Sequence, residues 1–199
     1  LTTRIETNFS DISRSEWNSC AHSDDGDSED RADRKNPFIS FEFLSALQNS
    51  GSAIPETGWK GAHFLISDGS KTLLAAAPCY LKTHSMGEYV FDQSWADAYT
   101  RAGGRYYPKL QISIPFTPVT GRRLLVSENA PSHTATLLLQ SAIELCKQNK
   151  LSGLHTTFCI KQEFELGQEL GMLGRVSQQF HWLNNGYSNF NDFLNALSS

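Results

Sequence analysis

The stretch 84–123 gathers most of the side chains in this sequence that could do chemistry. It holds four of the six tyrosines, and its charged and amide residues include Glu88, Asp92, Asp97, Arg101, Arg105, Lys109, Gln111, Arg122 and Arg123. Rings that supply contact area, together with a few polar groups that fix orientation, are typical of a pocket for a polar ligand. Tyrosine is also tolerated at the edge of an ordinary core, so a purely structural segment is the alternative.

The size and composition of the chain fit one domain with a full-sized core. The chain has 199 residues, of which 39% are hydrophobic, and this suits a single domain. A formal net charge of -4 disfavours a nucleic-acid surface, although a local basic groove is compatible with it. No apolar run approaches the ~20 residues that span a bilayer, so we expect no membrane insertion.

The cysteines and histidines show no metal-ligand spacing. The four cysteines lie far apart in apolar surroundings, which predicts reduced, buried thiols and a cytoplasmic compartment. No two histidines have HxH or HxxxH spacing, so we expect no metal. The chain begins with a leucine and shows no signal-peptide pattern, so we expect a cut piece of a longer protein.

The N-terminal third predicts a strand, a helix, an acidic loop and a second helix. A strand is expected within 4–12, and Ser13 with Glu16 has capping-box spacing for a short helix. Residues 22–35 are acidic with no large apolar side chain, so they cannot bury surface and should form a mobile loop. A metal-binding loop is the alternative, but the spacing of its acidic residues matches no calcium template. Asn36-Pro37 is a helix start, and Gly51 ends that helix.

The middle and C-terminal parts predict strands and helices that alternate. Strands at 59–66 and 71–81 flank a hairpin turn, and Pro78 predicts a bulge or break in the second strand. Further strands are expected at 87–92, 106–115, 154–160 and 175–183, and further helices near 94–102, 132–148, 161–170 and 188–199. This order predicts an α/β (α+β) fold, with a mixed, mostly antiparallel sheet and helices on both faces.

Several segments resemble one known family. They are NPFISFEFLSALQNSG, HSMGEYVFDQSWADAYTRAGGRYYPKLQ, PFTPVTGRRLL, LHTTFC and QFHWLNNGYSNFNDFLNALSS. Together they resemble the FemAB-like branch, concerned with peptidoglycan biosynthesis/recognition, of the GNAT (Gcn5-related N-acyltransferase) superfamily. The resemblance covers nearly the whole chain outside the acidic loop.

The resemblance implies one GNAT-like domain over residues 1–199, and residues 188–199 would begin a helix that leads into a second GNAT-like half. It implies transfer of an acyl or aminoacyl group to an amine of a cell-wall-precursor-like acceptor. The donor co-substrate would be an acyl-CoA or an aminoacyl-tRNA, with no tightly bound cofactor. The expected partners are therefore a small-molecule or peptidoglycan-precursor substrate, the second half, and tRNA.

Such a transfer needs a base for the amine and an acid for the leaving group. Glu88 or Asp92, at the two ends of an expected strand, could accept the amine proton, and Tyr106 or Tyr107 could protonate the leaving group. His155 is a further base with an ordinary pKa near neutral pH. For each of these residues, hydrogen bonding at a strand end is the structural alternative.

The turn Thr120-Gly121 is the expected anion site. A coenzyme A loop of this superfamily has two glycines and runs directly into a helix, whereas VTGRRLL has one glycine and continues as a strand. Arg122 and Arg123 could instead bind a phosphate through their side chains. Two solvated arginines at a turn are the alternative.

The remaining candidates are assigned to substrate binding. They are His84, Trp95, Lys109, Gln111, Gln179 and His181. Lys109 could contact a phosphate or carboxylate of the substrate, or pair with Glu88 or Asp92. Two functions therefore stay open: a catalytic acyltransferase domain, and a non-catalytic half that recognises a peptide or sugar nucleotide.

Overall fold

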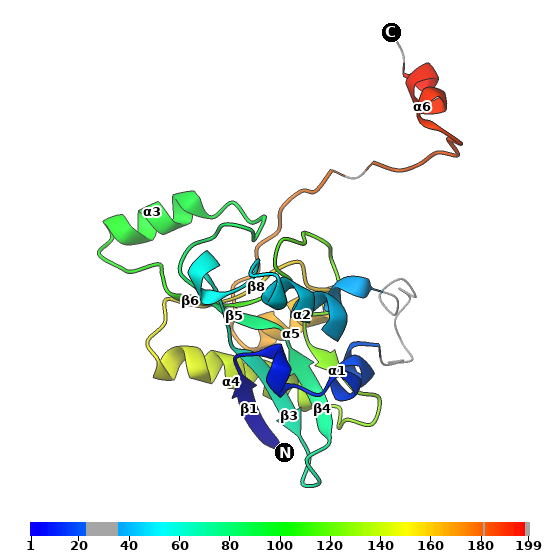
Figure 1. Ribbon diagram of the computed structural model, residues 1–199. Coiled ribbons are helices and arrows are strands. Elements are labelled where there is room, and N and C mark those ends of the chain that lie inside the picture. Colours follow the sequence, from blue (N-terminus) through cyan, green and yellow to red (C-terminus); the bar gives the residue numbers. More distant parts are fainter. Residues whose placement is uncertain (23–35, 181, 198–199) are drawn as a thin grey trace.

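The strands form two four-stranded sheets. The computed structural model describes residues 1–22, 36–180 and 182–197 (Figure 1), so the expected acidic loop lies outside the described residues except for His22. The first sheet is antiparallel and contains, in order, β1 (Thr2–Glu6), β3 (His63–Ser67), β4 (Leu73–Ala77) and β7 (Leu125–Val126). The second contains β2 (Trp59–Gly61), β5 (Cys79–Lys82), β6 (Lys109–Ile112) and β8 (Leu154–Thr156), and only its β6–β8 pair is parallel.

The two sheets are joined where β4 passes into β5 and β2 passes into β3. Pro78 separates β4 from β5 and has no N–H to donate to a ladder. At the same level the Ala62 N–H donates to the Cys79 carbonyl at 2.8 Å, and the Ser113 N–H donates to the Pro78 carbonyl at 3.1 Å. The strand break predicted at Pro78 is therefore confirmed, and it divides one surface into two sheets.

Helices cover both faces of the first sheet, as predicted (Figure 1). Leu65 and Ala76 pair across β3 and β4 and pack with α1 (Arg14–Ala21) and α2 (Phe41–Asn49). The next pair along the strands, Phe64 and Ala77, packs against α4 (Thr134–Gln148) on the opposite face. The period of two along a strand thus divides the apolar residues between two cores.

One of the two N-terminal helices begins at its predicted cap, and the other begins four residues later than predicted. Ser13 Oγ accepts from the Glu16 N–H and starts α1. Asn36 caps only a 3-10 turn, η3 (Pro37–Ile39), and Ser40 then caps α2. Two further 3-10 turns are η1 (Phe9–Asp11) and η4 (Pro55–Thr57), and the buried Trp17 indole joins α1 to η3 by donating to the Ile39 carbonyl at 2.9 Å.

Two predicted strands are wrong. Residues 87–92 form an irregular loop in which Gly87 and Tyr89 both have positive φ, and α3 (Gln93–Arg101) follows it. The described part of 175–183 is extended and exposed but pairs with no strand that the structure describes. This segment follows α5 (Lys161–Glu169) and leads away from the sheets to α6 (Phe190–Ala196) (Figure 1).

No helix within the described residues has the length and apolar character needed to cross a membrane.

Replacing Trp17 by Phe should lower the free energy of unfolding by about 2–4 kcal/mol, because a buried carbonyl loses its donor and ring volume is lost. Urea unfolding followed by circular dichroism measures the change. Trp95→Phe is the matched control, since Trp95 lies on α3 and is 58% exposed. Equal effects of the two substitutions would contradict the role assigned to Trp17.

Candidate functional site

The polar side chains gather on one face of the second sheet. Lys82 on β5 lies opposite Trp59 on β2 and Lys109 on β6, and directly opposed residues share a face. Leu110 and Ile112, which alternate with these positions on β6, pack against α4 on the other face. The sheet therefore carries two neighbouring lysines on the face turned away from α4.

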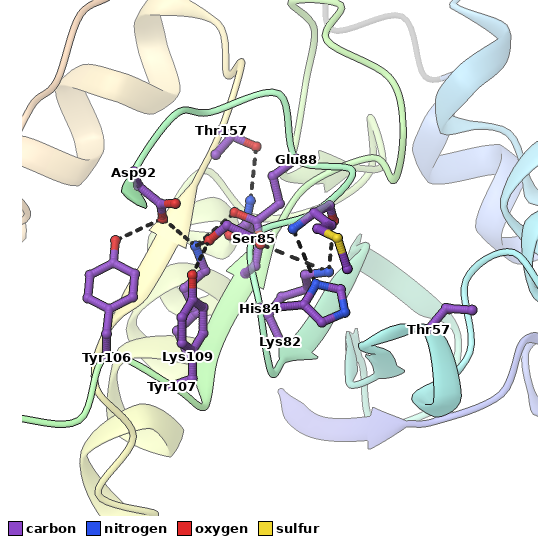
Figure 2. Close-up of polar contacts among 12 residues, drawn as sticks. Thr57, Lys82, His84, Ser85, Glu88, Asp92, Tyr106, Tyr107, Lys109 and Thr157 are labelled. Carbon is purple, nitrogen blue, oxygen red and sulfur yellow. Dashed lines mark hydrogen bonds and ion pairs between the residues drawn. The ribbon is translucent and has the colours of Figure 1, made fainter. Parts of the chain in front are cut away.

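Lys109 is the centre of a buried polar cluster (Figure 2). Its Nζ lies 2.7 Å from Glu88 Oε2, 2.8 Å from Asp92 Oδ2 and 2.9 Å from Ser85 Oγ. Lys109 and Asp92 are 0% exposed and Glu88 is 4% exposed. Of the two alternatives left open for Lys109, the structure shows the pairing, and it is with both carboxylates.

This contact explains why residues 87–92 do not form a strand. Residues four apart along a strand are separated by about 13 Å. Both carboxylates instead lie within 3 Å of one nitrogen atom, which requires the backbone between them to fold back. Positive φ angles at Gly87 (79°) and Tyr89 (54°) provide that reversal.

The two adjacent tyrosines complete the cluster. The Tyr106 hydroxyl donates to Asp92 Oδ2 at 2.9 Å, and the Tyr107 hydroxyl shares a hydrogen bond of 2.7 Å with Ser85 Oγ. Both tyrosines are half-buried, so they form the more accessible edge of the cluster. The structure thus brings together four of the five residues proposed for catalysis, with Lys109 between them.

The two carboxyl groups of the cluster have different electrostatic surroundings. Burial raises the pKa of Glu88, and the positive charges of Lys109 and Lys82 offset this only in part. Burial also acts to raise the pKa of Asp92, but hydrogen bonds from Lys109, Ser85 and Tyr106 together hold it below its usual value. Glu88 is therefore the carboxyl group that can more readily hold a proton.

Lys82 is a second buried cation beside this cluster. Its Nζ lies 4.0 Å from Glu88 Oε1 and 3.3 Å from the centre of the Trp59 ring, and its side chain is 0% exposed. Burial lowers its pKa to about 7, with Glu88 opposing and Lys109 reinforcing the shift. Lys82 therefore titrates near neutral pH.

Gln111 and His155 continue the same face, because they pair in register across β6 and β8. Gln111 Nε2 donates to Thr157 Oγ1 at 3.4 Å, and Gln111 Oε1 is buried with no hydrogen-bond partner among the described residues. The His155 ring packs edge-on against Tyr106, 5.8 Å between centres. Burial, aided by the charge of Lys109, lowers the His155 pKa to about 4. The sequence predicts a pKa near neutral pH for this residue, and the structure places it lower.

The geometry of the Thr120-Gly121 turn disfavours the predicted anion site. Arg123 is 1% exposed, and its guanidinium group donates to the carbonyls of Val119, Gly121, Arg122 and Thr157. Arg122 Nη2 donates to the Ala21 carbonyl at 2.6 Å. Both arginines therefore point inward to hold backbone, and neither is a solvated side chain at a turn.

Three backbone N–H groups at and after this turn are also occupied. The Gly121 N–H donates to the Phe158 carbonyl at 3.0 Å. Glu163 on α5 accepts from the N–H groups of both Arg123 and Leu124 at 2.7 Å through one oxygen, Oε1. A protein carboxylate thus takes the position that a phosphate would need, and Thr120 is the exposed residue of the turn.

The other substrate-binding candidates are spread out. His84 Nδ1 accepts from the Met86 N–H and orients the start of the loop, and burial together with the charge of Lys82 lowers the His84 pKa. Trp95 lies on α3, with its ring 4.9 Å from the Arg175 guanidinium. Gln179 Nε2 donates to the Pro118 carbonyl at 2.7 Å, and His181 lies outside the described residues.

Sequence reasoning missed Lys82 and Ser85. Lys82 follows Tyr80 by two residues, so alternation along the predicted strand already placed the two on one face. Nothing in the sequence alone indicates the register that sets Lys82 beside Lys109. Within the described ranges, no group of three or more His, Cys, Asp or Glu residues is placed to hold a metal ion.

The chain belongs to the FemAB-like family, described as peptidoglycan biosynthesis/recognition, whose family model matches residues 8–199. This confirms the resemblance seen in the sequence. A search of curated proteins finds no significant match.

Solved structures of similar fold are distant in sequence. A mutant of the BH1408 protein from Bacillus halodurans is 13% identical with a TM-score of 0.50, and the match covers 92% of this chain and 99% of that one. An aminoglycoside 6'-N-acetyltransferase from Acinetobacter haemolyticus is 13% identical with a TM-score of 0.49, covering 92% and 99%. A glucosamine-6-phosphate N-acetyltransferase from Arabidopsis thaliana is 9% identical with a TM-score of 0.49, covering 92% and 100%. Likeness at this level of identity concerns the fold alone.

Lys82→Met should change how stability depends on pH. In wild-type protein, folded Lys82 loses its proton near pH 7, whereas unfolded lysine keeps it up to its usual pKa of 10.5. The unfolded state binds more protons in this window, so Lys82 makes the free energy of unfolding rise as pH rises from 7 to 10.5. The free energy of unfolding of wild type minus that of Lys82→Met should therefore increase as the pH rises over that range.

Urea unfolding at pH 6, 7, 8 and 9 measures this difference. Lys60→Met, at an exposed position on the neighbouring strand β2, should leave the pH dependence unchanged. A difference between wild type and Lys82→Met that stays constant with pH would contradict the assignment.

Arg123→Lys should lower the free energy of unfolding by about 2–4 kcal/mol, because one ammonium group cannot reach the carbonyls that the guanidinium fork holds. Thermal unfolding against Arg105→Lys, at an exposed position, provides the comparison. Unchanged stability together with weaker phosphate binding would instead return Arg123 to the anion-binding role.

Proposed function

We propose that this chain is an N-acyltransferase-type domain that transfers an acyl or aminoacyl group to an amine of a cell-wall-precursor-like acceptor. The family assignment supports the class of reaction, together with the GNAT-like domain that the sequence resemblance implies. The observation that carries the proposal is the Lys109 cluster, in which Lys109 binds a buried carboxyl group of raised pKa, Glu88, and also Ser85, the partner of the Tyr107 hydroxyl.

Glu88 is the proposed general base. Its Oε1 has no hydrogen-bond partner among the described residues, while its Oε2 is fixed by Lys109. A raised pKa brings a carboxylate closer to the pKa that general-base catalysis favours. The acceptor amine would give its proton to Oε1 as its nitrogen attacks the carbonyl carbon of the thioester or ester donor.

Tyr107 is the proposed proton donor to the leaving group. The bond from the carbonyl carbon to sulfur or oxygen breaks, and the departing thiolate or alkoxide needs a proton. The Tyr106 hydroxyl already donates to Asp92, whereas the Tyr107 hydroxyl shares its proton with Ser85 Oγ. Asp92 and Lys109 then act as positioning residues that hold Glu88 and both tyrosines.

A non-catalytic recognition domain is the second candidate. It is favoured by the Gly121 turn, where internal carbonyl and carboxylate groups occupy the N–H groups that a donor phosphate would use. In that case a peptidoglycan precursor would bind this domain, and the acyl donor would bind elsewhere.

Glu88→Gln should lower kcat for acyl transfer about 10²–10⁴-fold with a smaller change in KM, since it removes the base and keeps the shape. The assay follows transfer from acetyl-coenzyme A, and separately from aminoacyl-tRNA, to a UDP-linked muropeptide. Glu144→Gln on the exposed side of α4 is the matched control.

Unfolding midpoints of both variants show whether a lost activity reflects a lost fold. Full activity in Glu88→Gln would remove Glu88 from the mechanism. Saturable muropeptide binding by wild type without turnover from either donor would favour the recognition domain.

A further inference from the structure

A cavity of about 320 Å³ lies beside the polar cluster, at the junction of the two sheets. Its walls come from the exit of β1, α2, η4, β2 and β5, and Trp59, Tyr80 and His63 line it. Trp59 also carries Lys82 above its ring, so the cavity and the Lys109 cluster share a face of the second sheet. None of the residues proposed for acyl transfer lines this cavity.

The cavity depends on a close approach of two backbone segments. A Cβ atom at Gly61 would lie 2.3 Å from the Thr7 carbonyl, so only glycine allows β2 to pass the end of β1 here. The Phe9 N–H donates to Gln48 Oε1 at 2.9 Å, and Gln48 Nε2 donates to Asn8 Oδ1 at 2.8 Å, which joins η1 to α2 at another wall. The cavity is therefore held by defined contacts on two sides.

Two neutral donors of the cavity have no acceptor among the described residues. His63 is 1% exposed and its Nδ1 accepts from the Cys79 N–H at 3.3 Å, so the ring hydrogen lies on Nε2, next to Gly61. Burial lowers the His63 pKa to about 3, which keeps the ring uncharged. Within the described residues, neither His63 Nε2 nor the hydroxyl of Tyr80, which is 3% exposed, has a hydrogen-bond partner.

The cavity offers no charge to a ligand. None of its described lining residues is acidic. Lys60 is the only basic one, and it alternates with Trp59 and Gly61 along β2, which places its side chain on the opposite face of the strand. A charged ligand would therefore lose its hydration without gaining a counter-charge, which is strongly unfavourable.

We propose that this cavity binds a small uncharged ligand that carries an amide or carbonyl acceptor on an apolar or aromatic body. The carbonyl oxygen accepts from His63 Nε2–H and from the Tyr80 hydroxyl, neither of which has a partner among the described residues. The apolar or aromatic body of the ligand packs among Phe9, Ala53 and Trp59. Apolar walls with a few polar groups are typical of small-molecule pockets. This site goes beyond the proposed acyl transfer and needs no acyl donor.

Three matched probes test whether the cavity prefers an uncharged ligand. Each is titrated calorimetrically into the purified chain. N-acetyl-L-phenylalaninamide is neutral, N-acetyl-L-phenylalanine is anionic, and L-phenylalaninamide is cationic. The neutral probe should bind at least about tenfold more tightly than either charged probe, because only it enters without an unpaired charge. Tighter binding of a charged probe, or no saturation by the neutral probe up to ~10 mM, overturns the proposal.

Variants test where the neutral probe binds. Tyr80→Phe keeps the ring and should weaken binding about fivefold through one lost hydrogen bond, whereas Tyr187→Phe near the C-terminus should leave it unchanged. Ala53→Leu fills the cavity and should abolish binding, with Ala98→Leu on exposed α3 as control. If Ala53→Leu does not fold, the comparison of Tyr80→Phe with wild type decides. Equal affinity of these two proteins for the neutral probe overturns the proposal.

The amide could belong to a peptide segment or to a free small molecule. A blocked dipeptide, N-acetyl-L-alanyl-L-phenylalaninamide, distinguishes these two sources. Tighter binding than the single blocked residue supports the proposed site with a peptide segment as ligand. Weaker binding supports it with a free small molecule as ligand.

Discussion

The ion contact between Lys109 and the two carboxylates of Glu88 and Asp92 is the constraint on which the site depends. All three groups are almost fully buried, where an unpaired charge is costly, so each must find its partner when the chain folds. Lys109 belongs to a strand, whereas both carboxylates belong to the loop before α3. The contact therefore fixes an otherwise irregular segment over the sheet, and the tyrosines that follow α3 join it through Asp92 and Ser85.

A second organising element is the break at Pro78. It ends the apolar ladder of β4 and begins β5, whose Tyr80 and Lys82 face away from α4. One continuous segment thus supplies a hydrophobic core on one side of the break and polar chemistry on the other. The cavity with His63 forms where the neighbouring strand makes the same passage, from β2 to β3.

The features that the sequence predicts are those that depend on neighbouring residues. Ser13 and Pro78 act through local capping and a missing donor, and both predictions are confirmed. The strand predicted at 87–92 fails because alternation of polar and apolar residues also suits a loop whose two carboxylates bind one distant cation. The inward direction of Arg123 and the neighbouring position of Lys82 depend on tertiary register, which periodicity does not contain.

The helix α3 shows how this arrangement separates a fixed frame from an exchangeable part. None of its residues is buried. The Tyr106 hydroxyl after it donates a hydrogen bond to Asp92 before it, so the two ends of the segment are held together. The sequence between these ends can change in composition or length without disturbing the core. The domain therefore carries an exposed segment beside its buried charges, whose surface can vary while ion pairs and hydrogen bonds hold the structure beneath it.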